Sequence, residues 1–106
     1  MNIEQQVKKI EELIKDKKAK DVVVFNVEKL TSAVSYFVLA SATSTTQAKG
    51  IVDYLEDEMS KLKFEPIRKD TKNLSGWVVL DYGDIMVHIM TDEVREFYKL
   101  EKIWTK

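Results

Sequence analysis

The stretch around which this sequence is organised is residues 77–90, Trp-Val-Val-Leu-Asp-Tyr-Gly-Asp-Ile-Met-Val-His-Ile-Met. Two apolar, β-branched runs flank Gly83-Asp84, which is the pattern of a β-hairpin with a tight turn. Glycine adopts the positive φ that the first turn position requires. The turn is therefore predicted at Gly83-Asp84, with Tyr82 opposite Ile85.

This register divides the hairpin side chains into two sets, because alternate residues of a strand point to opposite faces. One set is largely hydrocarbon and is expected to face the core: Val78, Leu80, Tyr82, Ile85, Val87 and Ile89. The other set, here called the mixed face, is Trp77, Val79, Asp81, Met86, His88 and Met90. Aromatic and methionine side chains are enriched at interfaces, so the mixed face is either half-covered by a helix or reserved for a partner.

The rest of the chain predicts three helices and three more strands. Amphipathic periodicity indicates helices over residues 2–18 and from Ser44 to Lys63, and acids after Thr91 begin a third. Strands are expected over residues 21–27, 36–41 and 65–71. The element order, α-β-β-α-β-β-β-α, favours a single α/β domain over residues 1–106, a two-layer sandwich with a mixed five-stranded sheet.

Several positions carry more specific expectations. Residues 21–27 are apolar on both sides, which favours a central strand, whereas the charges in residues 65–71 favour an edge. Gly50 lies inside the second helix, where close approach of another backbone would explain it. The last helix is expected to turn three side chains inward and the tail to pack one tryptophan against the body; these are Val94, Phe97, Tyr98 and Trp104.

Composition restricts the function classes. The net charge of −1 argues against a protein that wraps nucleic-acid phosphates, so no direct sequence-specific nucleic acid binding is expected. The absence of cysteine excludes disulfides and thiolate metal sites. The polar N-terminus and the lack of a bilayer-length apolar run predict a cytoplasmic protein without a membrane partner. Residues 81–96 hold five acids against Arg95 alone, a charge suited to a basic protein surface.

No catalytic constellation is assembled by the sequence. His88 is the only histidine, and no nucleophile turn accompanies it. Asp81, Asp84 and one imidazole are an incomplete set of ligands for a zinc ion. The simpler interpretation of Asp81 is that its carboxylate accepts hydrogen bonds from nearby backbone N–H groups. Residues 41–46 follow a strand and open a helix, so their hydroxyls are a weak candidate for anion binding, without a glycine to cradle phosphate. The chain is predicted to be no enzyme, with no catalytic residue, cofactor or metal.

Four spaced motifs resemble the ribosomal silencing factor S (Iojap-like, RsfS) family. Residues 77–88 are similar to its W-V-x-L-D-Y-G-D-x-x-V-H signature. The other motifs are Ala19-Lys-Asp-Val-Val-Val, Tyr36-Phe-Val-Leu-Ala-Ser with Ser44 and Gln47, and Arg95-Glu-Phe-Tyr-Lys-Leu-Glu-Lys-Ile-Trp104. Three residues depart from the family pattern: Ser35, Ala42 and Met90 stand where Asp, Gly and an aromatic residue are common. The first two touch the loop before the long helix, so a functional role of that loop is less safely carried over from the family.

The resemblance implies a nucleotidyltransferase-like fold that lacks the catalytic carboxylates. It also implies binding to the fourteenth protein of the large ribosomal subunit, which blocks joining of the small subunit and represses translation under nutrient limitation. Organellar relatives act in large-subunit assembly, so an assembly role is the alternative, and nucleotide binding is a weaker one. The predicted partner-binding residues are Trp77, Asp81, Tyr82, Asp84, Met86, His88, Met90 and Glu93. Self-association of the free protein through the same face is a further hypothesis.

Overall fold

The computed structural model describes residues 2–72 and 76–98, without the side chains of Lys72 and Tyr98. Its elements follow the predicted order: α1 (Ile3–Asp16), β1 (Lys20–Asn26), β2 (Tyr36–Ala42), α2 (Thr45–Lys61), β3 (Arg68–Lys72), β4 (Trp77–Asp81), β5 (Ile85–Thr91) and α3 (Asp92–Tyr98). Trp104 lies outside the described residues. Within the described part of the chain, no helix has the length and apolar character needed to cross a membrane.

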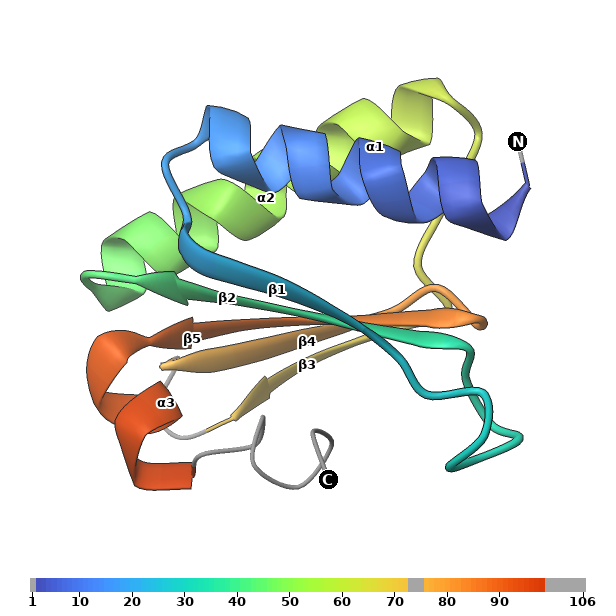
Figure 1. The fold of residues 1–106 in the computed structure, drawn as a ribbon. Coiled ribbons are helices and arrows are strands. Elements are labelled where there is room, and N and C mark those ends of the chain that lie inside the picture. Colours follow the sequence, from blue (N-terminus) through green and yellow to red (C-terminus); the bar gives the residue numbers. More distant parts are fainter. Residues whose placement is uncertain (1, 73–75, 99–106) are drawn as a thin grey trace.

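The five strands form one mixed sheet in the order β1-β2-β5-β4-β3. The β2–β5 pair is parallel and the other three pairs are antiparallel. Helices α1 and α2 lie together on one face of the sheet, and the short α3 lies on the opposite face near one end (Figure 1). The predicted α/β fold with a mixed five-stranded sheet and three helices is confirmed.

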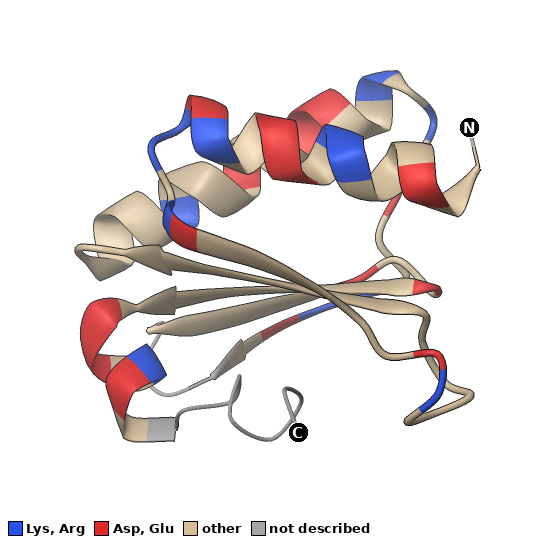
Figure 2. Ribbon diagram, viewed as in Figure 1, with Lys and Arg blue, Asp and Glu red and all other residues tan. Residues whose placement is uncertain are grey.

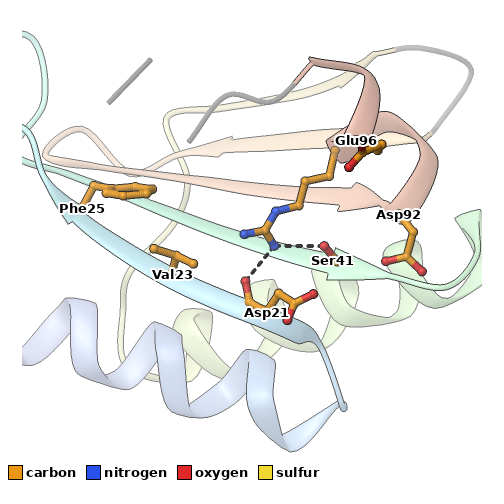
Figure 3. A pocket seen from close by; sticks show the side chains of 7 residues that line it. Asp21, Val23, Phe25, Ser41, Asp92 and Glu96 are labelled. Carbon is orange, nitrogen blue, oxygen red and sulfur yellow. Dashed lines mark hydrogen bonds between the residues drawn. The ribbon is translucent and has the colours of Figure 1, made fainter. Parts of the chain in front are cut away.

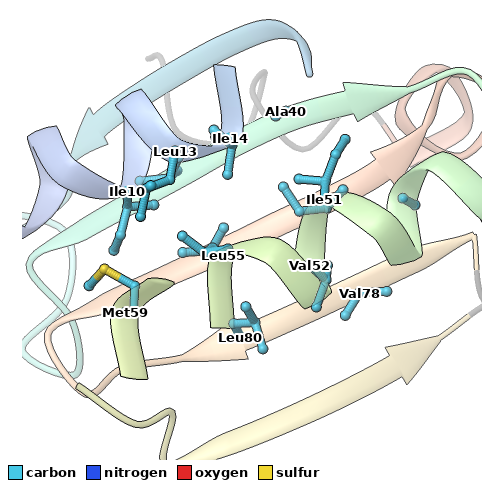
Figure 4. Close-up of a cluster of buried hydrophobic side chains, with 14 of the residues drawn as sticks. Ile10, Leu13, Ile14, Ala40, Ile51, Val52, Leu55, Met59, Val78 and Leu80 are labelled. Atoms are coloured by element: carbon cyan, nitrogen blue, oxygen red, sulfur yellow. The ribbon is translucent and has the colours of Figure 1, made fainter. Parts of the chain in front are cut away.

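The main core lies between the sheet and the pair α1 and α2. Ile10, Ile51 and Leu55 are 0–1% exposed and project from the two helices toward the sheet (Figure 4). Val38, Val87 and other strand side chains on the same face of the sheet pack against them. A second cluster on the α3 side contains Val27, Val34, Phe37, Leu39, Met90 and Val94. The sheet is therefore apolar on both faces, although only one is covered by long helices.

The helix starts follow from capping chemistry. Asn2 caps α1, because its side chain accepts from Gln5 N at 2.8 Å while the Gln5 side chain accepts from Asn2 N at 3.0 Å. Ser44 caps α2 through Gln47 N at 3.1 Å. The Gln47 side chain, however, accepts from Thr43 N and Thr43 Oγ1, so only half of the capping box expected there forms.

The prediction of a central position for β1 is wrong. Among the strands that the structure describes, it pairs only with β2 and forms an edge of the sheet. The strand has apolar side chains on both faces of the sheet. Val22 and Val24 pack toward the main core, whereas Phe25 packs against the second cluster. Coverage of both faces, rather than two neighbouring strands, accounts for the pattern. The predicted edge position of the charged β3 is confirmed.

Two further expectations, one about Phe97 and one about Gly50, also fail. Phe97 is 79% exposed rather than turned inward, because the seven-residue α3 presents only one narrow side to the sheet, occupied by buried Val94 and Arg95. Gly50 is exposed, and a Cβ built on it meets no atom within 4 Å, so no close backbone approach explains this glycine.

Replacing Gly50 with Ala is expected to stabilise the protein. The site is helical and open, so alanine removes backbone entropy from the unfolded chain and raises the free energy of unfolding by about 1 kcal/mol. Urea denaturation measures the change. Gly83→Ala is the opposite control, because Gly83 has φ +92° and a Cβ there would lie 3.2 Å from Ile67 Cδ1. An unchanged or lower stability for Gly50→Ala would contradict the account of this position.

Candidate functional site

The hairpin has the predicted register. Trp77 lies opposite Met90 and Asp81 opposite Met86, and Tyr82 N donates to Ile85 O at 2.9 Å. Gly83 supplies the positive φ of the turn, as expected for a two-residue loop with glycine first. The mixed face therefore lies on the side of the sheet that carries α3, away from α1 and α2.

Trp77 and His88 form a polar pair within the mixed face. The Trp77 indole Nε1 donates to His88 Nδ1 at 3.1 Å, and the two ring centroids are 6.0 Å apart. Phe37 also packs edge-on against the imidazole, with ring centroids 5.3 Å apart. An acceptor Nδ1 requires the tautomer of neutral histidine that carries its proton on Nε2. His88 is buried at 8% exposure, so its direct effect is to orient the half-buried indole.

Replacing His88 with Phe is expected to disturb the Trp77 indole while keeping an aromatic ring. Loss of the acceptor leaves the indole N–H without this bond, at a cost of about 1 kcal/mol in the free energy of unfolding. The indole ¹H–¹⁵N resonance of Trp77 reports the change directly, and His88→Asn, which retains an oxygen acceptor at the δ position, is the matched variant. An indole resonance that is identical in wild type and His88→Phe would show that the bond is not formed in solution.

Asp81 organises the turn, as predicted for an acceptor of nearby backbone. Its Oδ1 accepts from Gly83 N at 2.8 Å, and its Oδ2 lies 3.6 Å from Arg68 Nη2 on β3. The carboxylate side chain is 18% exposed. Asp84 is exposed, and its backbone oxygen accepts from the N–H groups of Ser35 and Tyr36. Two carboxylates therefore lie at the turn end of the hairpin, and the side chain of Asp84 faces solvent.

Tyr82 lies on the other face of the sheet from Trp77. It packs at the margin of the main core, and its buried hydroxyl has no hydrogen-bond partner among the described residues. Burial, followed by the nearby charges of Glu56 and Glu65, raises the pKa of the Tyr82 phenol above its ordinary value. The phenol therefore stays neutral at physiological pH. The structure does not bring Tyr82 together with the other predicted anchors.

Met90 and Glu93 also differ from the rest of the predicted set. Met90 is 0% exposed and packs with Leu39 and Val94 on the α3 side of the sheet, so its side chain is covered and is not available at the surface. The prediction of Met90 as an exposed anchor is therefore not retained. Glu93 is exposed on α3 and lines a hollow with Gly76 and Thr91. Trp77, Asp81, Asp84, Met86 and Glu93 remain accessible, fully or in part.

Arg95 is a structural residue whose burial was not predicted from the sequence. It is 9% exposed, and its Nη1 donates to Asp21 O at 2.7 Å and to Ser41 Oγ at 2.9 Å. These bonds fasten α3 to the first two strands, and a hollow of about 610 Å³ lies beside them (Figure 3). A single arginine among helix acids gives no sequence signal of burial, because arginine is usually exposed.

The described residues do not assemble a metal site: no group of three or more histidine or acidic side chains is placed to hold an ion. The weak anion candidate at residues 41–46 gains no support. Ser44 Oγ and Thr43 N are engaged with Gln47, and the adjoining hollow is also lined by Asp92 and Glu93, which repel an anion.

Comparison with known proteins gives consistent matches. The family model described as "Ribosomal silencing factor during starvation" matches residues 1–106. The chain is 37% identical over 87 residues to ribosomal silencing factor RsfS of Haemophilus influenzae, covering 82% of this chain and 85% of that protein. It is 33% identical over 96 residues to mouse "Mitochondrial assembly of ribosomal large subunit protein 1", covering 88% of this chain and 42% of that protein. A crystal structure of a Chromobacterium violaceum protein has a TM-score of 0.93 at 28% identity, covering 98% of this chain and 87% of that chain.

The fold and the hairpin define a small α/β domain with a mixed five-stranded sheet and, among its described residues, no metal-binding carboxylate group. The chain belongs to the ribosomal silencing factor (RsfS/Iojap) family. Members of this family are non-enzymatic factors, in agreement with the sequence prediction that the chain is not an enzyme.

Proposed function

We propose that the protein binds the large ribosomal subunit through its fourteenth protein and sterically blocks joining of the small subunit. Family membership supports a silencing role, as do relatives that carry the name ribosomal silencing factor. The proposed mechanism makes and breaks no covalent bond. A domain docked on one ribosomal protein occupies space that the small subunit needs.

The observation that carries the proposal is the chemistry of the hairpin. Trp77 and Met86 are half-buried on the face opposite the two long helices, and Asp81 and Asp84 lie at the turn end. Large apolar side chains act as anchors, whereas carboxylates at the margin pair with basic groups and set orientation. Ribosomal proteins are basic as a class, so this combination suits one of them as partner.

The proposed interface is smaller than the set predicted from sequence. It consists of Trp77, Asp81, Asp84, Met86 and Glu93. His88 acts by orienting the indole, and Met90 acts by packing against Val94 of α3. Tyr82 is left out of this interface, since it packs toward the main core on the other face of the sheet. A typical specific interface buries about 800 Å² on each partner.

Photo-crosslinking tests the partner directly. Benzoylphenylalanine at position 84 is expected to link the protein to the fourteenth protein of purified large subunits, as identified by mass spectrometry. The same group at position 57, exposed on α2, is the control and is expected to give no link to that protein. Crosslinks from position 84 to other components alone would contradict the proposed interface.

An assembly role is the second candidate. The mouse relative is named for assembly of the mitochondrial large subunit, and this chain spans 42% of its length. Accumulation of immature large subunits in a deletion strain, with normal subunit joining in the presence of the protein, would favour assembly over silencing.

A further inference from the structure

The two edges of the sheet differ in how they are protected. Edge strands present unpaired backbone groups, and proteins commonly guard them with charged side chains. The β3 edge follows this rule, with Arg68, Lys69 and Asp70 in succession. The β1 edge carries Val22-Val-Val-Phe25 in its middle and charges only at its start, a contrast visible in Figure 2. Among the described strands, β1 is therefore the edge without charge in its central residues.

The backbone groups that β1 directs outward can be identified from its register. Val27 N donates to Ser35 O at 2.9 Å, continuing the β1–β2 ladder. In an antiparallel ladder, alternate residues bond to the neighbouring strand. Phe25 and Val23 therefore turn their N–H and C=O groups toward β2, whereas Val24 and Asn26 turn theirs away from it. A bulge with Asp21 at φ +49° interrupts the pairing only before Val23.

Hollows flank this edge on both faces of the sheet. On the α3 side, the 610 Å³ hollow has Val23 and Phe25 as its apolar floor (Figure 3). On the α1 side, a hollow of about 230 Å³ is lined by Val7, Val24 and Tyr36, among others. Side chains of an added strand would alternate between these two spaces, because strand side chains alternate between faces.

The charge of the α3-side hollow favours a basic peptide segment over an acidic one. Its margin carries the carboxylates of Asp21, Asp92 and Glu96. Two cations lie among these carboxylates: Lys20 pairs with Asp92 at 2.8 Å, and Arg95, which also lines the hollow, is 9% exposed and donates to Asp21 O and Ser41 Oγ. The three carboxylates outnumber the two cations. A lysine or arginine entering from outside would therefore meet carboxylates, whereas an acidic side chain would be repelled.

We propose that β1 accepts a sixth strand from a basic, extended segment of a partner protein, with basic side chains at the α3-side hollow and apolar ones at the α1-side hollow. Main-chain bonds to Val24 and Asn26 give affinity, and the alternating hollows give specificity. This surface uses other residues than the hairpin interface, and β2 lies between β1 and the nearer hairpin strand, β5. It is also independent of the proposed function.

Amide hydrogen exchange with synthetic peptides tests the proposal. The probes are an end-blocked octapeptide of alternating Lys and Val and its Glu and Val counterpart. The Lys peptide is expected to slow exchange at Val24 and Asn26 about tenfold, with no effect from the Glu peptide. Asp21→Asn/Glu96→Gln is expected to abolish the slowing. Asparagine tolerates the positive φ at position 21, and Asp70→Asn on β3 is the matched control.

Three outcomes would overturn the proposal. The first is no slowing at Val24 and Asn26 with the Lys peptide at millimolar concentration, while core amides show that the protein is folded. The second is equal slowing by both peptides, which would remove the role of charge. The third is slowing that depends on protein concentration without peptide, which would identify a second copy of the chain as the occupant.

Discussion

Replacing Asp84 with Lys is expected to weaken binding to the large ribosomal subunit by at least about tenfold, because a like charge placed against a basic partner is strongly unfavourable. The side chain of Asp84 is exposed, and the turn uses only its backbone oxygen, as acceptor for Ser35 and Tyr36. Lysine retains that oxygen, so the fold is expected to remain intact. Co-sedimentation with purified large subunits measures the loss, and circular dichroism checks the fold.

A charge-matched control separates a local effect from a change in net charge. Asp57→Lys alters the charge equally on exposed α2, on the far side of the sheet, and is expected to bind normally. Trp77→Ala removes an apolar anchor and is expected to lose binding to a similar degree. Normal co-sedimentation of both Asp84→Lys and Trp77→Ala would count against the hairpin interface.

Replacing Leu55 with Ala is expected to lower the free energy of unfolding by about 2–5 kcal/mol, because the deleted methyl groups leave a cavity between α2 and the sheet. Leu55 is 0% exposed and belongs to the main core (Figure 4). Chemical denaturation measures the loss.

The same substitution at Leu62 is the matched control. Leu62 is 40% exposed at the end of α2, and its truncation is expected to cost less than about 1 kcal/mol. Equal losses at the two positions would show that the core between α2 and the sheet does not dominate stability.

The hairpin was predictable from the sequence down to its register. Gly83 restricts where the turn can lie, and the period of two then assigns every side chain of the hairpin to a face. The opposing pairs Trp77–Met90 and Asp81–Met86 confirm that assignment. Local turn chemistry and alternation are sufficient here, because neither depends on distant parts of the chain.

Strand position and side-chain exposure were less predictable, because both depend on tertiary packing. The hydrocarbon of residues 22–25 is equally compatible with two neighbouring strands and with apolar packing on both faces of an edge strand, and the structure shows the latter. Alternation placed Met90 on the mixed face, but its burial depends on a tertiary cluster that includes Val94 from α3. The bonds from Arg95 to the first two strands span more than 50 residues and have no local signature.

The most direct test of the account is a joining assay with purified ribosomal subunits. Light scattering follows formation of the complete ribosome after small subunits are added to large subunits preloaded with the protein. The wild-type protein is expected to prevent joining, and Asp84→Lys, at the same concentration, is expected not to prevent it. Complete ribosomes that form normally while the wild-type protein remains bound to the large subunit would contradict this expectation.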